Sequence, residues 1–64
     1  MIDKASWVEF RNVLAKEKNI GKFKILKPNQ IDLLVEKQPK TIEEIKNIIG
    51  EENQYSNEIF MHQT

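Results

Sequence analysis

The property that most limits this chain is its small size combined with a lack of cysteine. Its 64 residues contain no cysteine, so neither a disulfide nor a cysteine-bound metal can stabilise the fold. Ordering each residue costs conformational entropy, and a chain this short can build only one hydrophobic core to offset that cost. We therefore expect residues 1–64 to form a single domain, and we do not expect the deep pocket of a self-contained enzyme.

The first part of the chain predicts a helix over about residues 4–19. Ser6 and the Glu three residues later have the form of a capping box, and Asp3 is a competing N-cap one turn earlier. Asn19 and Gly21 are residues that commonly end a helix. The apolar stripe of this helix, at i, i+3 and i+7, is Trp7, Phe10 and Leu14.

Three further short helices are expected. Pro28 suits the first turn of a helix, and Pro39 ends that helix. Thr41 begins a capping box, and Gly50 ends the helix that follows it. A last helix ends near Met61, because apolar residues recur at i, i+4 and i+5 before it.

These elements predict an all-α fold, a compact bundle of four or five short helices. Residues 20–27 fit no helix: they alternate like a strand around Phe23 but have no partner strand, so we expect an extended connector pinned by its apolar residues. The core is expected to consist of Trp7, Phe10, Leu14, Ile25, Ile31, Leu34, Ile42, Ile45, Ile48 and Ile59.

Charge is unevenly distributed although the net charge is zero. Residues 41–64 are dominated by Glu, which leaves that part of the chain acidic. One interpretation is that the basic part binds an anion. The other is a solvated surface whose two oppositely charged halves attract each other. The basic residues of the region 11–28, which stand against Glu17 alone, are Arg11, Lys16, Lys18, Lys22, Lys24 and Lys27.

Motifs for catalysis and cofactor binding are absent. Neither GxxxxGK[ST] nor GxGxxG occurs, so the chain has no loop of the kind that cradles nucleotide phosphates. His62 is the only histidine, and its place near the C-terminus predicts a frayed residue rather than a catalytic or metal site. We expect no catalytic residue, no metal and no cofactor.

Nothing in the sequence predicts a membrane or secreted location. No apolar run approaches the roughly 20 residues that a transmembrane helix needs. The start of the chain lacks the basic and apolar segments of a signal peptide. We therefore expect a cytoplasmic protein without a membrane partner.

Basic residues surround an aromatic one in the connector, at Lys22, Phe23, Lys24 and Lys27. Lysines contact phosphates and an aromatic ring stacks on a base, so this pattern is typical of single-stranded nucleic-acid binding. The alternative is that Phe23 belongs to the core and the lysines are merely solvated.

The order of features along the chain resembles that of a known family. Residues 10–17 contain an apolar residue, an Arg and Leu-Ala ahead of an acidic residue, and residues 19–26 contain Asn-apolar, then an aromatic residue and a short apolar stretch. Residues 39–41 form Pro-x-Thr before a helix that ends at Gly50, and residues 55–59 are similar to Tyr-Gly-x-Glu-Ile. This ordered set resembles the HRDC domain, the helicase-and-RNase-D C-terminal module.

The resemblance covers about residues 7–61 and implies an accessory, non-catalytic module of a helicase or nuclease. HRDC domains assist binding of DNA or RNA, often weakly and often at single strands or junctions, and we expect weak, sequence-nonspecific binding by this chain. Some members instead bind another protein or their own helicase core, and this remains the alternative function. We expect a monomer. The contact residues that the resemblance implies are Lys22, Phe23, Lys24 and Lys27, extended by Arg11, Lys16 and Lys18.

Two features qualify this assignment. Arg11 has a structural alternative, in which it pairs with Glu43 or Glu44 and holds two helices together. The segment after Gly50 is shorter than in the family and carries two glutamates, which repel phosphate. That segment is therefore not expected to contact the nucleic-acid backbone.

Overall fold

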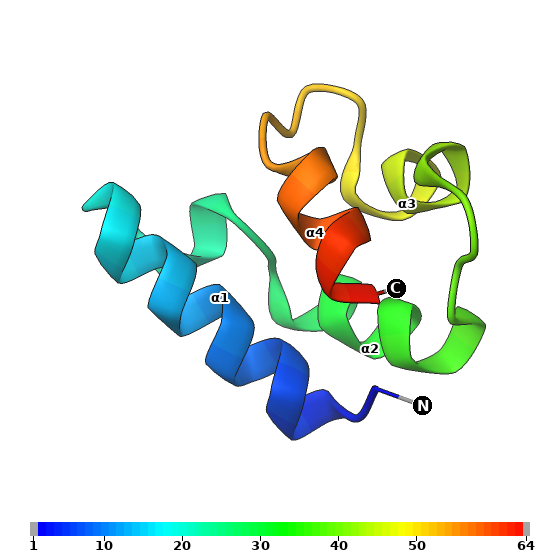
Figure 1. The fold of residues 1–64 in the computed structure, drawn as a ribbon, viewed down its shortest axis with the longest axis horizontal. Helices are drawn as coiled ribbons and strands as arrows, with labels where there is room; N and C mark the ends of the chain where they lie inside the picture. The colour runs from blue at the N-terminus through cyan, green and yellow to red at the C-terminus, as the bar shows by residue number, and fades with distance from the viewer. Residues whose placement is uncertain (1, 64) are drawn as a thin grey trace.

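The structure, a computed structural model, describes residues 2–63. Every secondary-structure element within these residues is a helix, which confirms the predicted all-α fold class. The elements, shown in Figure 1, are four α-helices and one short 3-10 helix: α1 (Lys4–Lys18), η1 (Lys22–Lys24), α2 (Pro28–Lys37), α3 (Ile42–Ile49) and α4 (Ser56–Gln63).

The helices pack largely in the order in which they follow one another. α1 crosses one side of the molecule and contacts both η1 and α2 (Figure 1). α2 then contacts α3, and α3 contacts α4. The radius of gyration is 10.4 Å, close to the value of about 10.7 Å expected for a compact chain of this length.

The core is a single cluster to which every α-helix contributes. Seven of the expected core residues are buried in it, whereas Phe10, Ile42 and Ile48 are only partly buried, so those three expectations were wrong. Ala15, Leu26 and Ile49 take part instead. The buried apolar residues are Trp7, Leu14, Ala15, Ile25, Leu26, Ile31, Leu34, Ile45, Ile49 and Ile59.

The first helix, Lys4–Lys18, confirms the predicted bounds of about 4–19, and of the two candidate N-caps it uses Asp3. The Ser6 backbone N–H donates to Asp3 Oδ1 at 2.9 Å, so Asp3 is the N-cap and Ser6 lies inside the helix. At the other end Asn19 adopts the left-handed conformation, with φ of 56°. Gly21 has φ of −66° and is not needed for the stop.

The connector is not extended, which corrects the prediction for residues 20–27. It forms the single turn η1, in which the Lys24 N–H donates to the Gly21 carbonyl at 3.0 Å and the Ile25 N–H to the Lys22 carbonyl at 3.1 Å. A lone strand would leave these amides without partners, and a 3-10 turn pairs them locally. The turn also points two consecutive residues, Ile25 and Leu26, into the core.

The later boundaries agree with the sequence signals. α2 starts at Pro28, and the Glu44 N–H donates to Thr41 Oγ1 at 3.2 Å at the start of α3. Gly50 has φ of 94°, a backbone conformation that other residues rarely adopt, so the backbone favours glycine there. α4 continues to Gln63, beyond its expected end near Met61.

His62 is packed rather than frayed, which corrects the expectation for the C-terminal end. Its ring stacks on Phe10 with centroids 4.4 Å apart and meets Trp7 edge-on at 4.7 Å. Its Nε2 lies 3.1 Å from Ser6 Oγ. The last turn of α4 is thereby fixed to α1, and burial lowers the pKa of His62 below its ordinary value of 6.5.

Stability should therefore fall on mild acidification. The pKa of His62 is lower in the folded chain than in the unfolded chain, so the unfolded chain takes up the proton first as the pH drops below 6.5. We expect the free energy of unfolding to be level above that pH and to decrease below it. Urea denaturation at pH values above the carboxylate range, which lies at about 4, measures this. His62→Phe should remove the slope, and an unchanged slope would contradict the assignment.

A second prediction concerns the N-cap. Asp3→Ala should lower the free energy of unfolding by about 1 kcal/mol, because it leaves the Ser6 N–H without its side-chain acceptor. Asp3→Asn keeps an acceptor oxygen and serves as the matched control. Equal stability of the two variants in urea denaturation would show that Asp3 does not cap α1.

Candidate nucleic-acid interface

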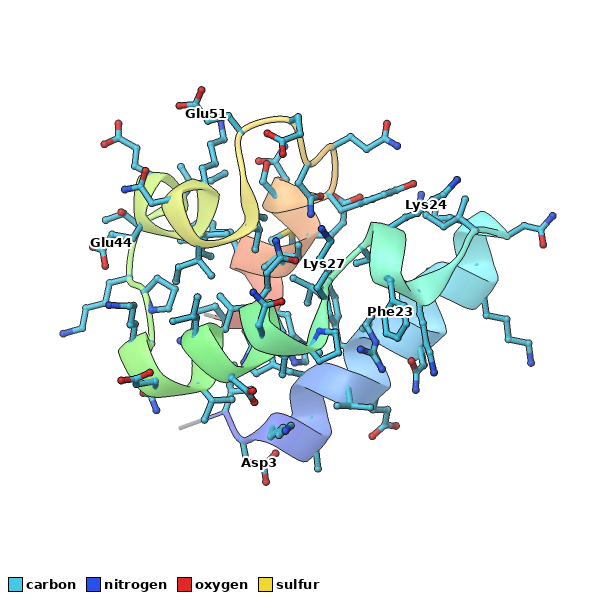
Figure 2. All side chains as sticks on the ribbon, turned by 180° about the vertical axis from the view of Figure 1, so that it is seen from behind. Asp3, Phe23, Lys24, Lys27, Glu44 and Glu51 are labelled. Atoms are coloured by element: carbon cyan, nitrogen blue, oxygen red, sulfur yellow. The ribbon has the colours of Figure 1, made fainter. Side chains whose placement is uncertain are left out.

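Four predicted contact residues lie together on the connector between α1 and α2. Lys22, Phe23 and Lys24 form η1, and Lys27 directly precedes α2; all four are exposed. Figure 2 shows Phe23, Lys24 and Lys27 along this segment. Phe23 is 54% exposed, so the alternative in which it belongs to the core is wrong. We call these four residues the connector surface.

The Phe23 ring is held in place by cations. The Arg11 guanidinium carbon and the Lys22 Nζ each lie 5.5 Å from the ring centroid, within the range of cation–π attraction. Arg11 itself is only 6% exposed, and its Nε donates to Asn12 Oδ1 at 3.2 Å. Arg11 therefore acts beneath the connector surface and positions its aromatic residue.

The proposed pairing of Arg11 with an acidic residue of α3 is not observed. Within residues 2–63 no ion pair joins Arg11 to Glu43 or Glu44. The structural alternative for Arg11 was therefore wrong about the partner. The aromatic partner was not foreseen, because the sequence does not show that the connector folds back over α1.

The two lysines near the end of α1 are on different faces. Both Lys16 and Lys18 are exposed. At 3.6 residues per turn, Lys18 lies about 20° from Arg11 around the helix axis, whereas Lys16 lies about 140° from it. Lys18 is therefore able to extend the connector surface, and Lys16 faces another side of α1.

A groove of about 490 Å³ adjoins the connector surface. Phe23, Lys24 and Lys27 line one wall, and Tyr55 from the loop before α4 lines the other. The groove also contains one carboxylate, Glu52. Two aromatic rings and two lysines therefore border one continuous depression, and sequence reasoning had not assigned Tyr55 to the site.

Polar side chains tie the walls of this groove together. Asn53 Nδ2 donates to the Ile25 carbonyl at 2.8 Å, and Asn53 Oδ1 accepts from the Tyr55 N–H at 2.8 Å. Gln30 Oε1 accepts from the Lys27 N–H at 2.9 Å, and Gln30 Nε2 donates to the Ile49 carbonyl at 3.3 Å. The groove is thus preformed.

The sequence held a local signal for both Gln30 and Asn53. A Gln at the third helical position often accepts from the backbone N–H of the N-cap, as Gln30 does from Lys27. An Asn two residues before the residue that it binds is a common turn motif, so Asn53 was a candidate for ordering the start of α4. Its second bond, to Ile25, spans distant parts of the chain and has no local signal.

Opposite charges are only partly segregated in space, because Glu52 lines the groove together with Lys24 and Lys27. Figure 2 shows Glu44 and Glu51 on one side of the molecule and Lys24 and Phe23 on the other. The ion pair found in the part of the chain that the structure describes is an exposed one elsewhere, 3.1 Å between Lys4 Nζ and Asp32 Oδ1. Within those residues, no ion pair joins the basic and acidic regions.

Among residues 2–63, no group of three or more His, Cys, Asp or Glu is placed to hold a metal ion. None of their helices is both long and apolar enough to cross a membrane.

Comparison with known proteins gave one match. The family model described as the HRDC domain matches residues 8–59, which span α1 to the first half of α4. The predicted resemblance is thereby confirmed over most of the chain. Neither the curated proteins nor the solved structures gave a match.

Two neighbouring residues of the connector should respond differently to truncation. Phe23→Ala should cost less than about 1 kcal/mol of unfolding free energy, because the ring is largely exposed. Ile25→Ala should cost about 2–5 kcal/mol, because that side chain is buried in the core. Denaturant titrations of both variants test this, and a larger loss for Phe23→Ala would place its ring in the core after all.

Proposed function

Because this chain belongs to the HRDC domain family, we propose that residues 1–64 form a single accessory module that binds single-stranded or junction nucleic acid. HRDC domains are small accessory modules of helicases and nucleases. Binding is proposed to be weak and independent of sequence, by a monomer, without catalysis of its own. A cytoplasmic location stays a prediction.

The observation that carries the proposal is the connector surface. Its three lysines are exposed around an exposed aromatic ring, and the segment is anchored by the buried Ile25 and Leu26, which lie between Lys24 and Lys27. Lysines attract the phosphates of a strand, and stacking of one base on an aromatic ring contributes about 1–3 kcal/mol. Stacking needs an unpaired base, which favours single strands and junctions over continuous duplex.

The groove supports binding without sequence preference. Base reading requires donors and acceptors that are free to meet base edges. The amides of Gln30 and Asn53 are already bonded to the protein backbone. We propose that the strand meets the charges of Lys24 and Lys27 and the aromatic faces of the groove, and these do not distinguish one base from another.

Charge reversal on the connector tests this function. The double variant Lys22→Glu/Lys24→Glu should abolish binding of a fluorescent oligothymidylate, measured by anisotropy at low salt. For the natural chain, three lysine–phosphate contacts predict a slope of log affinity against log salt of about −2. A slope near zero would contradict a phosphate-contacting surface.

The matched control reverses two exposed lysines, one at the C-terminal end of α2 and one in the loop that follows it. Lys37→Glu/Lys40→Glu makes the same change in net charge away from the connector surface. This control should lose only a minor part of the affinity. Equal losses in both variants would mean that binding follows net charge, and the proposed surface would then be wrong.

A further inference from the structure

A second groove lies on another face of α1, against the end of α4. It has a volume of about 290 Å³, at the lower limit of pockets that hold small molecules. Val13 is 53% exposed within its lining, although it is apolar. The residues that line the groove are Ser6, Glu9, Phe10, Val13, Leu14, Glu17 and His62.

This groove is separate from the connector surface. Val13 follows Arg11 by two residues, which places the two about 160° apart around the helix axis. Arg11 lies beneath Phe23, whereas Val13 lines the groove beside His62. A molecule bound in this groove would therefore leave the connector surface accessible.

The charged side chains of the lining are both carboxylates. Glu9 and Glu17 stand four residues before and four residues after Val13, so the three share one stripe of α1. The two carboxyl-bearing residues are about 12 Å apart along the helix axis. His62 does not offset them at neutral pH, because burial favours its neutral ring.

The floor between the two carboxylates is rigid and largely apolar. Phe10 and His62 are stacked with their centroids 4.4 Å apart, and Ser6 Oγ lies 3.1 Å from His62 Nε2. An apolar side chain that entered here would cover exposed parts of Val13 and Phe10 without reordering the fold. Grooves of this kind accept one face of an amphipathic helix.

We propose that this groove docks a basic amphipathic helix of a partner protein. One apolar side chain of that helix would sit on Val13, and Lys or Arg residues four positions before and after it would pair with Glu9 and Glu17. The spacing suits a helix lying along α1, because i and i+8 of any α-helix are separated by the same distance. Charge complementarity identifies the partner as basic. This docking proposal does not depend on the proposed nucleic-acid binding.

Two designed peptides test the inference. Both are alanine-rich helices with a central Leu; one carries Lys four residues to either side of it, and the other carries Glu at those two positions. The lysine peptide should shift the backbone amides of residues 9–17 and the ring protons of His62 in the labelled chain at low salt. The glutamate peptide should not. Equal responses to the two peptides would overturn the proposal.

Charge swapping provides the sharper control. Glu9→Lys/Glu17→Lys should reverse the preference, so that the glutamate peptide binds and the lysine peptide does not. Glu36→Lys/Glu51→Lys changes two exposed glutamates outside the groove by the same charge and should keep the original preference. If the first pair leaves the preference unchanged, the groove is not the docking site.

A milder variant guards against loss of folding. Glu9→Gln/Glu17→Gln keeps the shape of both side chains and should weaken the lysine peptide about fivefold at low salt, because each exposed ion pair contributes modestly. Unchanged affinity would contradict the pairing.

A second copy of the chain is the competing occupant of the groove. Shifts at residues 9–17 that depend on protein concentration alone would show that a second copy covers the groove, and this would overturn the proposal. Shifts at the same residues on addition of an oligonucleotide would also overturn the docking proposal. Failure of an oligonucleotide to bind the connector surface would overturn the proposed function and leave the docking proposal unaffected.

Discussion

The burial of two adjacent residues, Ile25 and Leu26, is the constraint on which the candidate interface depends. They are 1% and 0% exposed, so the connector cannot leave the core without opening it. Both residues can point inward because the 3-10 turn η1 directly precedes them and redirects the backbone. The residues just before them, Phe23 and Lys24, then have to point outward, and the exposed ring follows from the geometry of the buried pair.

α1 organises the rest of the molecule because each of its faces has a different task. Trp7 and Leu14 face the core, Arg11 lies under the connector, and Glu9 and Glu17 border the groove beside α4. A net charge of zero therefore conceals one basic and one acidic surface. An anion and a basic partner would each meet a surface of complementary charge, on separate sides of one helix.

How far the sequence predicts the structure depends on how local each signal is. The start of α2 at Pro28 and the stop at Gly50 were predictable, because they depend on neighbouring backbone atoms. The HRDC resemblance could also be predicted from the sequence, as could the grouping of three lysines and one phenylalanine in the connector. The packing of His62 on Phe10 and of Arg11 on Phe23 was not, because these contacts join residues that only the tertiary fold brings together.

The most direct measurement is a titration of the labelled chain with a short oligothymidylate at low salt, following backbone amide shifts. The account predicts shifts concentrated at residues 22–27 and at Tyr55, lost as salt is raised, since lysine–phosphate contacts weaken with ionic strength. A spectrum that does not change, or shifts confined to the acidic region 41–52, would contradict the central claim that the connector surface binds nucleic acid.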